Sequence, residues 1–191
     1  MSIQLLLDGH SFSVTFPNGN PTSKKEHGVI DVEVLSPRSM LVPTELFRTE
    51  LAGDILAANG MTPLSEDVVV VSRPQNGMVA IMSIHEEAIE QVQDQLGERI
   101  SFTTPLLHDP QFKDHVVWID QRGALIYIKV YNTKLRFAEV VPIATEADLR
   151  LLIEGLAKEF AIEDYQLTLA GEHQKTLRKA IGSRFNKVVC E

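Results

Sequence analysis

The sequence predicts an α/β protein made of two similar halves. Short apolar segments of strand length alternate with longer segments whose apolar residues recur at helical spacing. The order of these elements restarts at Val116, as expected for an internal duplication. Of the 191 residues, 44% are hydrophobic and 23% are charged, which is typical of a globular protein and not of a disordered one.

The first half is expected to begin with three strands. Ile3–Leu7 and Phe12–Phe16 flank an Asp-Gly turn, which is a strong hairpin signal because glycine readily adopts the positive φ of a tight turn. The polar segment 18–28 contains several turn-forming residues and predicts a loop. Val29–Leu35 then alternates apolar and acidic residues, as a half-buried strand does.

The rest of the first half predicts helix, strand, strand, helix and strand. Pro43 suits the first turn of a helix that ends at Asn59-Gly60. Val68–Ser72 is continuously apolar and is therefore expected to be a central strand, parallel to the first one. The remaining predicted elements are the strand Met78–Met82, a helix that begins at a Ser83–Glu86 capping box and stops at Gly97, and the strand Ile100–Leu106.

The second half follows a connection over residues 108–114. We expect the first half to span residues 1–107 and the second half residues 115–191. A second capping box, Thr145–Asp148, begins a helix with Leu152 in the middle of its apolar face. The other predicted elements are strands at Val116–Asp120, Ala124–Tyr131, Leu135–Val141, Tyr165–Leu169 and Lys187–Cys190, and a helix at Glu172–Ile181. We expect Tyr165–Leu169 to be central and parallel to the first strand of its half.

Each half thus contains three strands, a helix, a strand, a helix and a strand. Met78–Met82 is extra, because nothing in the second half corresponds to it. An added strand at a sheet edge exposes unpaired backbone groups. We therefore expect this strand to bind a protein partner or a second copy of the chain.

This order of elements resembles the ribonuclease-H-like βββαβα unit, and two such units in tandem resemble the actin-like ATPase fold. The opening 8–14 (DGHSFSV), residues 41–47 (LVPTELF) and residues 103–107 (TTPLL) are similar to an uncharacterised bacterial family, the domain of unknown function 3822. That family is similar in fold to actin-like ATPases and has no assigned activity.

The resemblance implies where a nucleotide would bind. In the actin-like fold an aspartate that ends the first strand of each half orients Mg²⁺ or water, adjacent turns hold the phosphates, and glycines pack against the adenosine. The residues that match these positions are Asp8, Gly9, Ser11, Asp120, Gly123 and Gly171. They make Mg-ATP, bound in the cleft between the halves, the cofactor of an alternative hypothesis in which the chain is a weak nucleotide-binding protein or ATPase.

Each of these matches departs from the pattern. Gln121 and Arg122 are bulky where the phosphate turn needs small residues, and Gly171 is a single glycine where a pair is expected. Glu172 adds a negative charge beside the expected position of the negatively charged nucleotide. Arginine can also neutralise phosphate, so Arg122 keeps the alternative open. The hypothesis that the residues favour is a non-catalytic scaffold or protein-binding module with a degenerate nucleotide site and no cofactor.

A metal-dependent nuclease is the third hypothesis. Ribonuclease-H-like enzymes gather acidic residues to hold two Mg²⁺ ions, and Asp8, Glu45 or Glu50, and Asp67 lie on suitable elements. Acidic residues at the ends of elements are common, however, and the whole chain is acidic. No Walker loop, G-x-S-x-G or G-x-G-x-x-G motif is present.

Charge and composition limit the partners. The formal net charge of −8 argues against a nucleic-acid partner, because such proteins usually present a basic face. No apolar run has the length of a membrane span, so no membrane partner is expected. The only cysteine is Cys190 and no export signal is visible, from which we expect a cytoplasmic protein.

Overall fold

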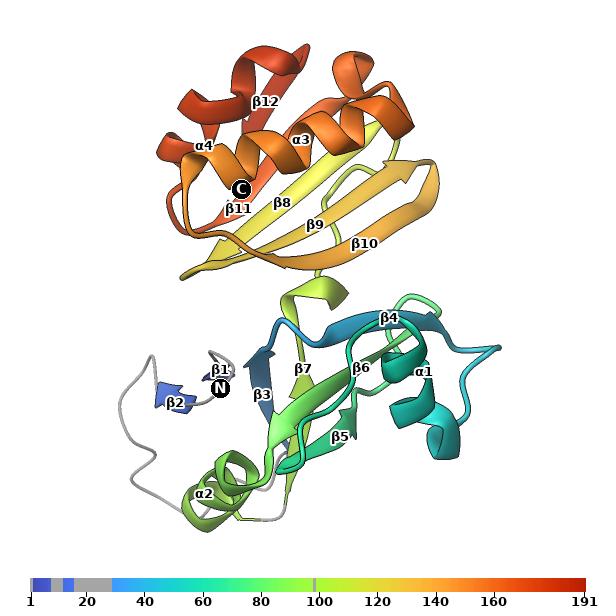
Figure 1. Cartoon of the computed structure of the whole chain (residues 1–191), viewed down its shortest axis with the longest axis vertical. Helices are drawn as coiled ribbons and strands as arrows, with labels where there is room; N and C mark the ends of the chain where they lie inside the picture. Colours follow the sequence, from blue (N-terminus) through green and yellow to red (C-terminus); the bar gives the residue numbers. More distant parts are fainter. Residues whose placement is uncertain (1, 8–11, 16–28, 98) are drawn as a thin grey trace. The chain divides into compact units, whose positions relative to one another are not determined.

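The computed structural model describes residues 2–7, 12–15, 29–97 and 99–191, and the side chains from residue 29 onward. The chain forms two compact units, Met1–His108 and Asp109–Glu191, each described below by itself (Figure 1). The described residues contain four α-helices and three sheets. Short 3₁₀ helices lie at Thr49–Leu51, Pro105–Leu107, Ile162–Asp164 and Gly182–Arg184.

The second unit contains one five-stranded sheet with the order β10-β9-β8-β11-β12. The first three strands along the chain form an antiparallel meander, and β11 and β12 continue the sheet parallel to β8. The predicted central position of Tyr165–Leu169, parallel to the first strand of its half, is confirmed. The strands are β8 (Val116–Arg122), β9 (Leu125–Asn132), β10 (Lys134–Pro142), β11 (Gln166–Gly171) and β12 (Lys187–Cys190).

Both helices of the second unit, α3 (Glu146–Phe160) and α4 (Gln174–Ile181), pack on the same face of this sheet (Figure 1). The predicted capping box of α3 is present, since Thr145 and Asp148 each bind the other's backbone N–H. Leu152 is only partly buried, whereas Ile153 is completely buried. The centre of the apolar face is therefore one residue later than predicted.

The first unit has a four-stranded sheet with the order β2-β1-β3-β7. The first three strands differ from the all-antiparallel arrangement of the ribonuclease-H-like unit, because β3 pairs with β1 in parallel and with β7 in parallel on its other side. Val32 and Val34 of β3 lie in the core, but Glu33 between them is also only 5% exposed, so this strand is more buried than its alternating sequence predicts. The strands are β1 (Ser2–Leu7), β2 (Phe12–Thr15), β3 (Ile30–Leu35) and β7 (Ile100–Thr103).

A second sheet of this unit has the order β4-β6-β5, from β4 (Ser39–Pro43), β5 (Asp67–Val71) and β6 (Met78–His85). Three predictions are wrong here. Pro43 ends a strand, and the helix α1 (Ala52–Ala58) begins later. The valine run of β5 is an antiparallel edge strand and not a central parallel one, while the predicted edge strand Met78–Met82 lies in the middle.

The prediction of a central strand failed for β5 because β6, and not β5, is the strand that is buried on both faces. Ala80, Met82 and Ile84 face the core shared with β3 and the helix α2 (Glu86–Leu96), whereas Ile81 faces a separate core with α1. Because β6 continues to His85, Ser83 is a strand residue and does not cap α2. Gly97 ends α2 at positive φ, as predicted.

The two larger sheets share a four-strand arrangement. In each, a hairpin is followed by two further strands that are parallel to its first strand: β2-β1-β3-β7 in one unit and β9-β8-β11-β12 in the other. Residues 16–29 separate β2 from β3, whereas β10 and α3 lie between β9 and β11. No helix among the described residues is long and apolar enough to cross a membrane.

Candidate functional site at the carboxyl ends of β8 and β11

Three of the six predicted nucleotide-site residues lie together in the second unit. Asp120 is near the end of β8, Gly123 is in the turn that follows, and Gly171 ends the neighbouring strand β11. The parallel register pairs Ala170 with Asp120 and Gly171 with Gln121. The other three predicted residues, Asp8, Gly9 and Ser11, lie outside the described residues.

Asp120 is engaged by an arginine of its own strand. Arg122 donates from Nε to Oδ1 at 2.9 Å and from Nη2 to Oδ2 at 3.1 Å, so both carboxylate oxygens accept a hydrogen bond. The Asp120 side chain is only 1% exposed, whereas the arginine is 23% exposed. A bidentate ion pair of this kind is strong and geometrically specific, because two N–H groups of the planar guanidinium match the two oxygens of the carboxylate.

Gly171 lies directly against this carboxylate. Its φ is +70°, and a Cβ placed on it would be 1.9 Å from Oδ1 of Asp120 and 2.5 Å from the carbonyl oxygen of Gln121. Only glycine fits a position with both a left-handed backbone and so close a neighbour. Packing between β8 and β11 is therefore sufficient to explain this glycine without an adenosine.

The hairpin turn between β8 and β9 is closed by Glu172. The backbone N–H of Gly123, which has φ +54°, donates to Oε2 of Glu172 at 3.2 Å. The backbone N–H of Glu172 donates in turn to the carbonyl oxygen of Gln121 at 2.9 Å. A turn that would offer N–H groups to phosphate thus already donates one to a carboxylate of the chain.

A buried lysine lies on the same face of the sheet as Asp120. Lys129 of β9 is fully buried, with Nζ 4.5 Å from the ring centre of Trp118 and 3.2 Å from Oδ1 of Asp109. Lys113 and the hydroxyl of Tyr131 bind the same carboxylate, each at 2.5 Å. These contacts connect Asp109 and Lys113, at the start of the second unit, with β9.

The network changes the pKa values of its members. Burial lowers the pKa of Lys129 to about 8, although the neighbouring Asp109 partly opposes this effect. Burial alone would raise the pKa of Asp109, but hydrogen bonds from Lys113, Tyr131 and Lys129 outweigh it and lower the pKa to about 2. The cluster was not predicted from the sequence, in which its one signal is a lysine within the otherwise apolar strand 125–131.

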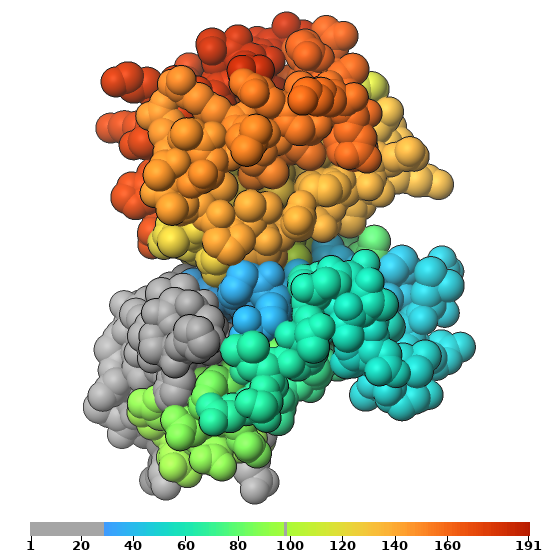
Figure 2. Space-filling view, in the orientation of Figure 1, coloured from blue at the N-terminus to red at the C-terminus, as the bar shows by residue number. Residues whose placement is uncertain are grey.

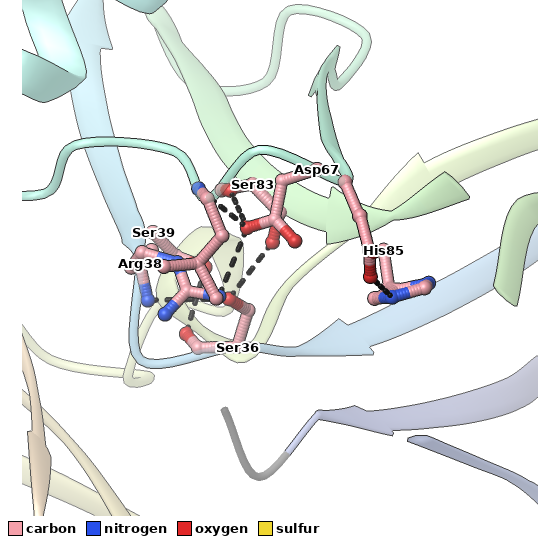
Figure 3. Close-up of polar contacts among 8 residues, drawn as sticks. Ser36, Arg38, Ser39, Asp67, Ser83 and His85 are labelled. Carbon is pink, nitrogen blue, oxygen red and sulfur yellow. Dashed lines mark hydrogen bonds and ion pairs between the residues drawn. The ribbon is translucent and has the colours of Figure 1, made fainter. Parts of the chain in front are cut away.

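The first unit contains another polar cluster, which joins β5, β6 and the turn before β4 (Figure 3). Asp67 accepts hydrogen bonds from the hydroxyl of Ser83 and from Nη2 of Arg38, the latter at 2.9 Å. Burial tends to raise the pKa of Asp67, but these bonds and one from the backbone N–H of Leu64 lower it. Ser83 is completely buried and the Asp67 side chain is 2% exposed, so neither can reach a substrate in this structure.

The acidic residues considered for a nuclease do not converge. Glu45 and Glu50 are exposed near the start of α1, whereas Asp67 is held by Ser83 and Arg38. Among the described residues, no group of three or more His, Cys, Asp or Glu side chains could hold a metal ion. Asp8, the remaining acidic candidate, lies outside the described residues.

Comparison with solved structures identifies the fold. A protein of unknown function from Bacteroides thetaiotaomicron VPI-5482, with an actin-like ATPase fold, aligns with a TM-score of 0.72. The two chains are 17% identical over 100% of this chain and 90% of that chain. This chain shares the actin-like ATPase fold.

Another similar structure is the cytoplasmic domain of EpsL, an inner membrane component of the type II secretion system of Vibrio cholerae. It is 10% identical over 100% of this chain and 85% of that chain, with a TM-score of 0.43. No protein-family model matches the sequence, and a search of curated proteins found no match.

Proposed function

We propose that this chain is a non-catalytic protein-binding module that has kept the actin-like ATPase fold and lost its nucleotide site. In this proposal the two units derive from ribonuclease-H-like units, and the chain is a divergent relative of the domain of unknown function 3822. The strand arrangement common to the two larger sheets supports a shared origin of the units.

The observation that carries the proposal is the ion pair between Asp120 and Arg122. Magnesium and attacking water both need a carboxylate oxygen that is free to bind them. Here both oxygens accept hydrogen bonds from one guanidinium. Freeing the carboxylate would leave a charge unpaired at a buried position, which typically costs about 3–5 kcal/mol.

The alternative, a weak nucleotide-binding protein, is favoured by a different observation. Asp120, Gly123 and Gly171 do lie together, and Arg122 remains 23% exposed, so its guanidinium is accessible to a phosphate. In that case Arg122 would leave Asp120 when a nucleotide binds. The two hypotheses predict opposite responses to Mg-ATP.

The test is thermal unfolding with and without millimolar Mg-ATP. A ligand that binds only the folded state, present at 100 times its Kd, adds about 2.7 kcal/mol, which raises Tm by several degrees. We expect no shift for the wild type or for Arg122→Ala. A shift in the wild type that disappears in both Asp120→Ala and Arg122→Ala would refute the proposal and support nucleotide binding.

A further inference from the structure

The second unit has a groove between helix α3 and the edge strand β10. It has a volume of about 510 Å³, and its lining residues all come from 137–159. In Figure 2 the surfaces of α3 and β10 adjoin on the face of this unit that is turned to the viewer. The lining is mostly apolar and includes Phe137 and Val141 of β10 and Leu151 of α3.

The charges in this groove are all of one sign. Glu139, Asp148 and Glu159 line it, and no lysine, arginine or histidine does. Within the described part of the chain, the carboxylate of Glu139 has no hydrogen-bond or ion-pair partner. Partial burial raises its pKa, as expected for a carboxylate between apolar side chains.

The strand that carries Glu139 is suited to pairing with another strand. β10 is the outer strand of its sheet, and no strand of the described residues pairs with its side away from β9. A bulge between Leu135 and Phe137 interrupts the beginning of β10, and pairing with β9 is regular from Phe137 to Pro142. In this regular part Phe137, Glu139 and Val141 alternate along the face that carries α3.

The opposite wall of the groove, formed by α3, contains Gly155, at a position where the helix has no requirement for glycine. Gly155 lies inside α3, where glycine is about 1 kcal/mol less favourable than alanine. A Cβ at this position would meet nothing within 4 Å. Packing within the chain therefore gives no reason for the missing side chain, whereas a segment bound in the groove would need that space. Leu151, one helical turn earlier, is 70% exposed and offers apolar surface to the same segment.

We propose that β10 binds an extended segment of a partner protein as an added strand, with an apolar–x–Lys/Arg–x–apolar pattern that places the cation opposite Glu139. Residues directly opposite each other on paired strands have Cβ atoms about 5 Å apart, close enough for an ion pair. The two apolar residues then lie opposite Phe137 and Val141 and cover the groove toward Gly155. This inference rests on the proposed function, since it assigns the binding surface of that module.

The experiment uses a fluorescent peptide of about seven residues, within the usual length of a strand. It has valine, lysine and valine at alternate positions and threonine between them; in a matched peptide, glutamate replaces the lysine. Anisotropy is measured with the whole chain and with Glu139→Lys. Glu163→Lys makes the same change of charge at an exposed position outside the groove.

The lysine peptide is expected to bind saturably to the wild type and to Glu163→Lys, and at least about tenfold more weakly to Glu139→Lys, a difference of about 1.4 kcal/mol. The glutamate peptide should show the reverse preference. Gly155→Leu, which fills the groove with a good helix former, should reduce binding far more than Gly155→Ala. Unchanged far-ultraviolet circular dichroism confirms that each variant is folded.

Three results would overturn the inference. The first is that neither peptide binds, and the second is that the peptides bind with the same affinity to the wild type and to Glu139→Lys. The third is that the wild type without peptide forms a dimer in light scattering that Glu139→Lys dissociates, because a second copy would then occupy the groove. Thermal unfolding with and without Mg-ATP is measured on the same protein samples, so that failure of the proposed function is seen separately. Nucleotide binding together with intact peptide recognition would refute the proposed loss of the nucleotide site and leave this inference standing.

Discussion

Replacing Gly171 by alanine tests whether this glycine serves packing between β8 and β11. The added Cβ would lie 1.9 Å from Oδ1 of Asp120 and 2.5 Å from the carbonyl oxygen of Gln121, whereas Cβ atoms essentially never approach another atom within 3.0 Å. The carboxylate would therefore have to move by more than 1 Å. It cannot do so freely, because Arg122 holds both of its oxygens.

The expected cost has two parts. A left-handed backbone at a residue other than glycine costs roughly 1–2 kcal/mol, and overpacking a close-packed site typically costs about 1–3 kcal/mol. We therefore expect Gly171→Ala to lower the free energy of unfolding by about 2–5 kcal/mol. Gly123→Ala is the matched control in the same unit, because Gly123 also has positive φ but a Cβ there meets nothing within 4 Å. Gly123→Ala should therefore lower the free energy of unfolding only by the roughly 1–2 kcal/mol of the left-handed backbone.

Urea unfolding followed by tryptophan fluorescence measures this difference. Trp118 is the only tryptophan of the chain and is buried in the second unit, so its emission reports on that unit. If Gly171→Ala and Gly123→Ala lower the free energy of unfolding equally, β11 can move away from Asp120 at little cost. The packing explanation of Gly171 would then fail.

Three further predictions concern the cores and the buried charges. Ile153→Ala should lower the free energy of unfolding by about 2–5 kcal/mol and Leu152→Ala by clearly less, since only Ile153 is completely buried. Urea unfolding that gives the same loss of free energy for both variants would contradict this. The pKa of Lys129 falls from 10.5 to about 8 on folding, so the folded state binds fewer protons between these values and stability rises with pH there. Lys129→Met should flatten this rise in urea unfolding between pH 8 and pH 10, and an unchanged slope would exclude Lys129 as its source. Ser83→Ala removes a hydrogen bond to the buried carboxylate of Asp67 and should cost about 1.5–3 kcal/mol in urea unfolding followed by circular dichroism, whereas no loss would show that Arg38 suffices.

The second unit could be predicted well from the sequence because its signals are local. Each strand is separated from the next by a turn or a helix, and the capping box at Thr145 has the expected hydrogen bonds. The first unit depends on contacts between distant segments. The valine run of β5 suggested burial on both faces, but its neighbours in space made it an edge strand. Ser83 matched a capping pattern, yet its hydroxyl binds Asp67 across the sheet.

The resemblance to the actin-like fold indicated Asp120, Gly123 and Gly171, and the structure places Gly171 against Asp120. The sequence did not predict which groups these residues bind. Whether Arg122 serves a phosphate or its neighbouring carboxylate depends on a side-chain direction that no sequence pattern specifies. The pairing of Lys129 with Asp109 joins β9 to a segment 20 residues earlier, and strand periodicity carries no information about such a contact.

The strand β6 has a consequence for how we expect the first unit to unfold. Its alternate side chains belong to two different cores, one shared with β3 and α2 and the other with α1. Neither core can be taken apart without exposing one face of the same strand, so the two sheets form a single cooperative unit. Slowly exchanging amides should consequently be found in both sheets with similar protection, although β4, β5 and β6 of one sheet are inserted between β3 and β7 of the other along the chain.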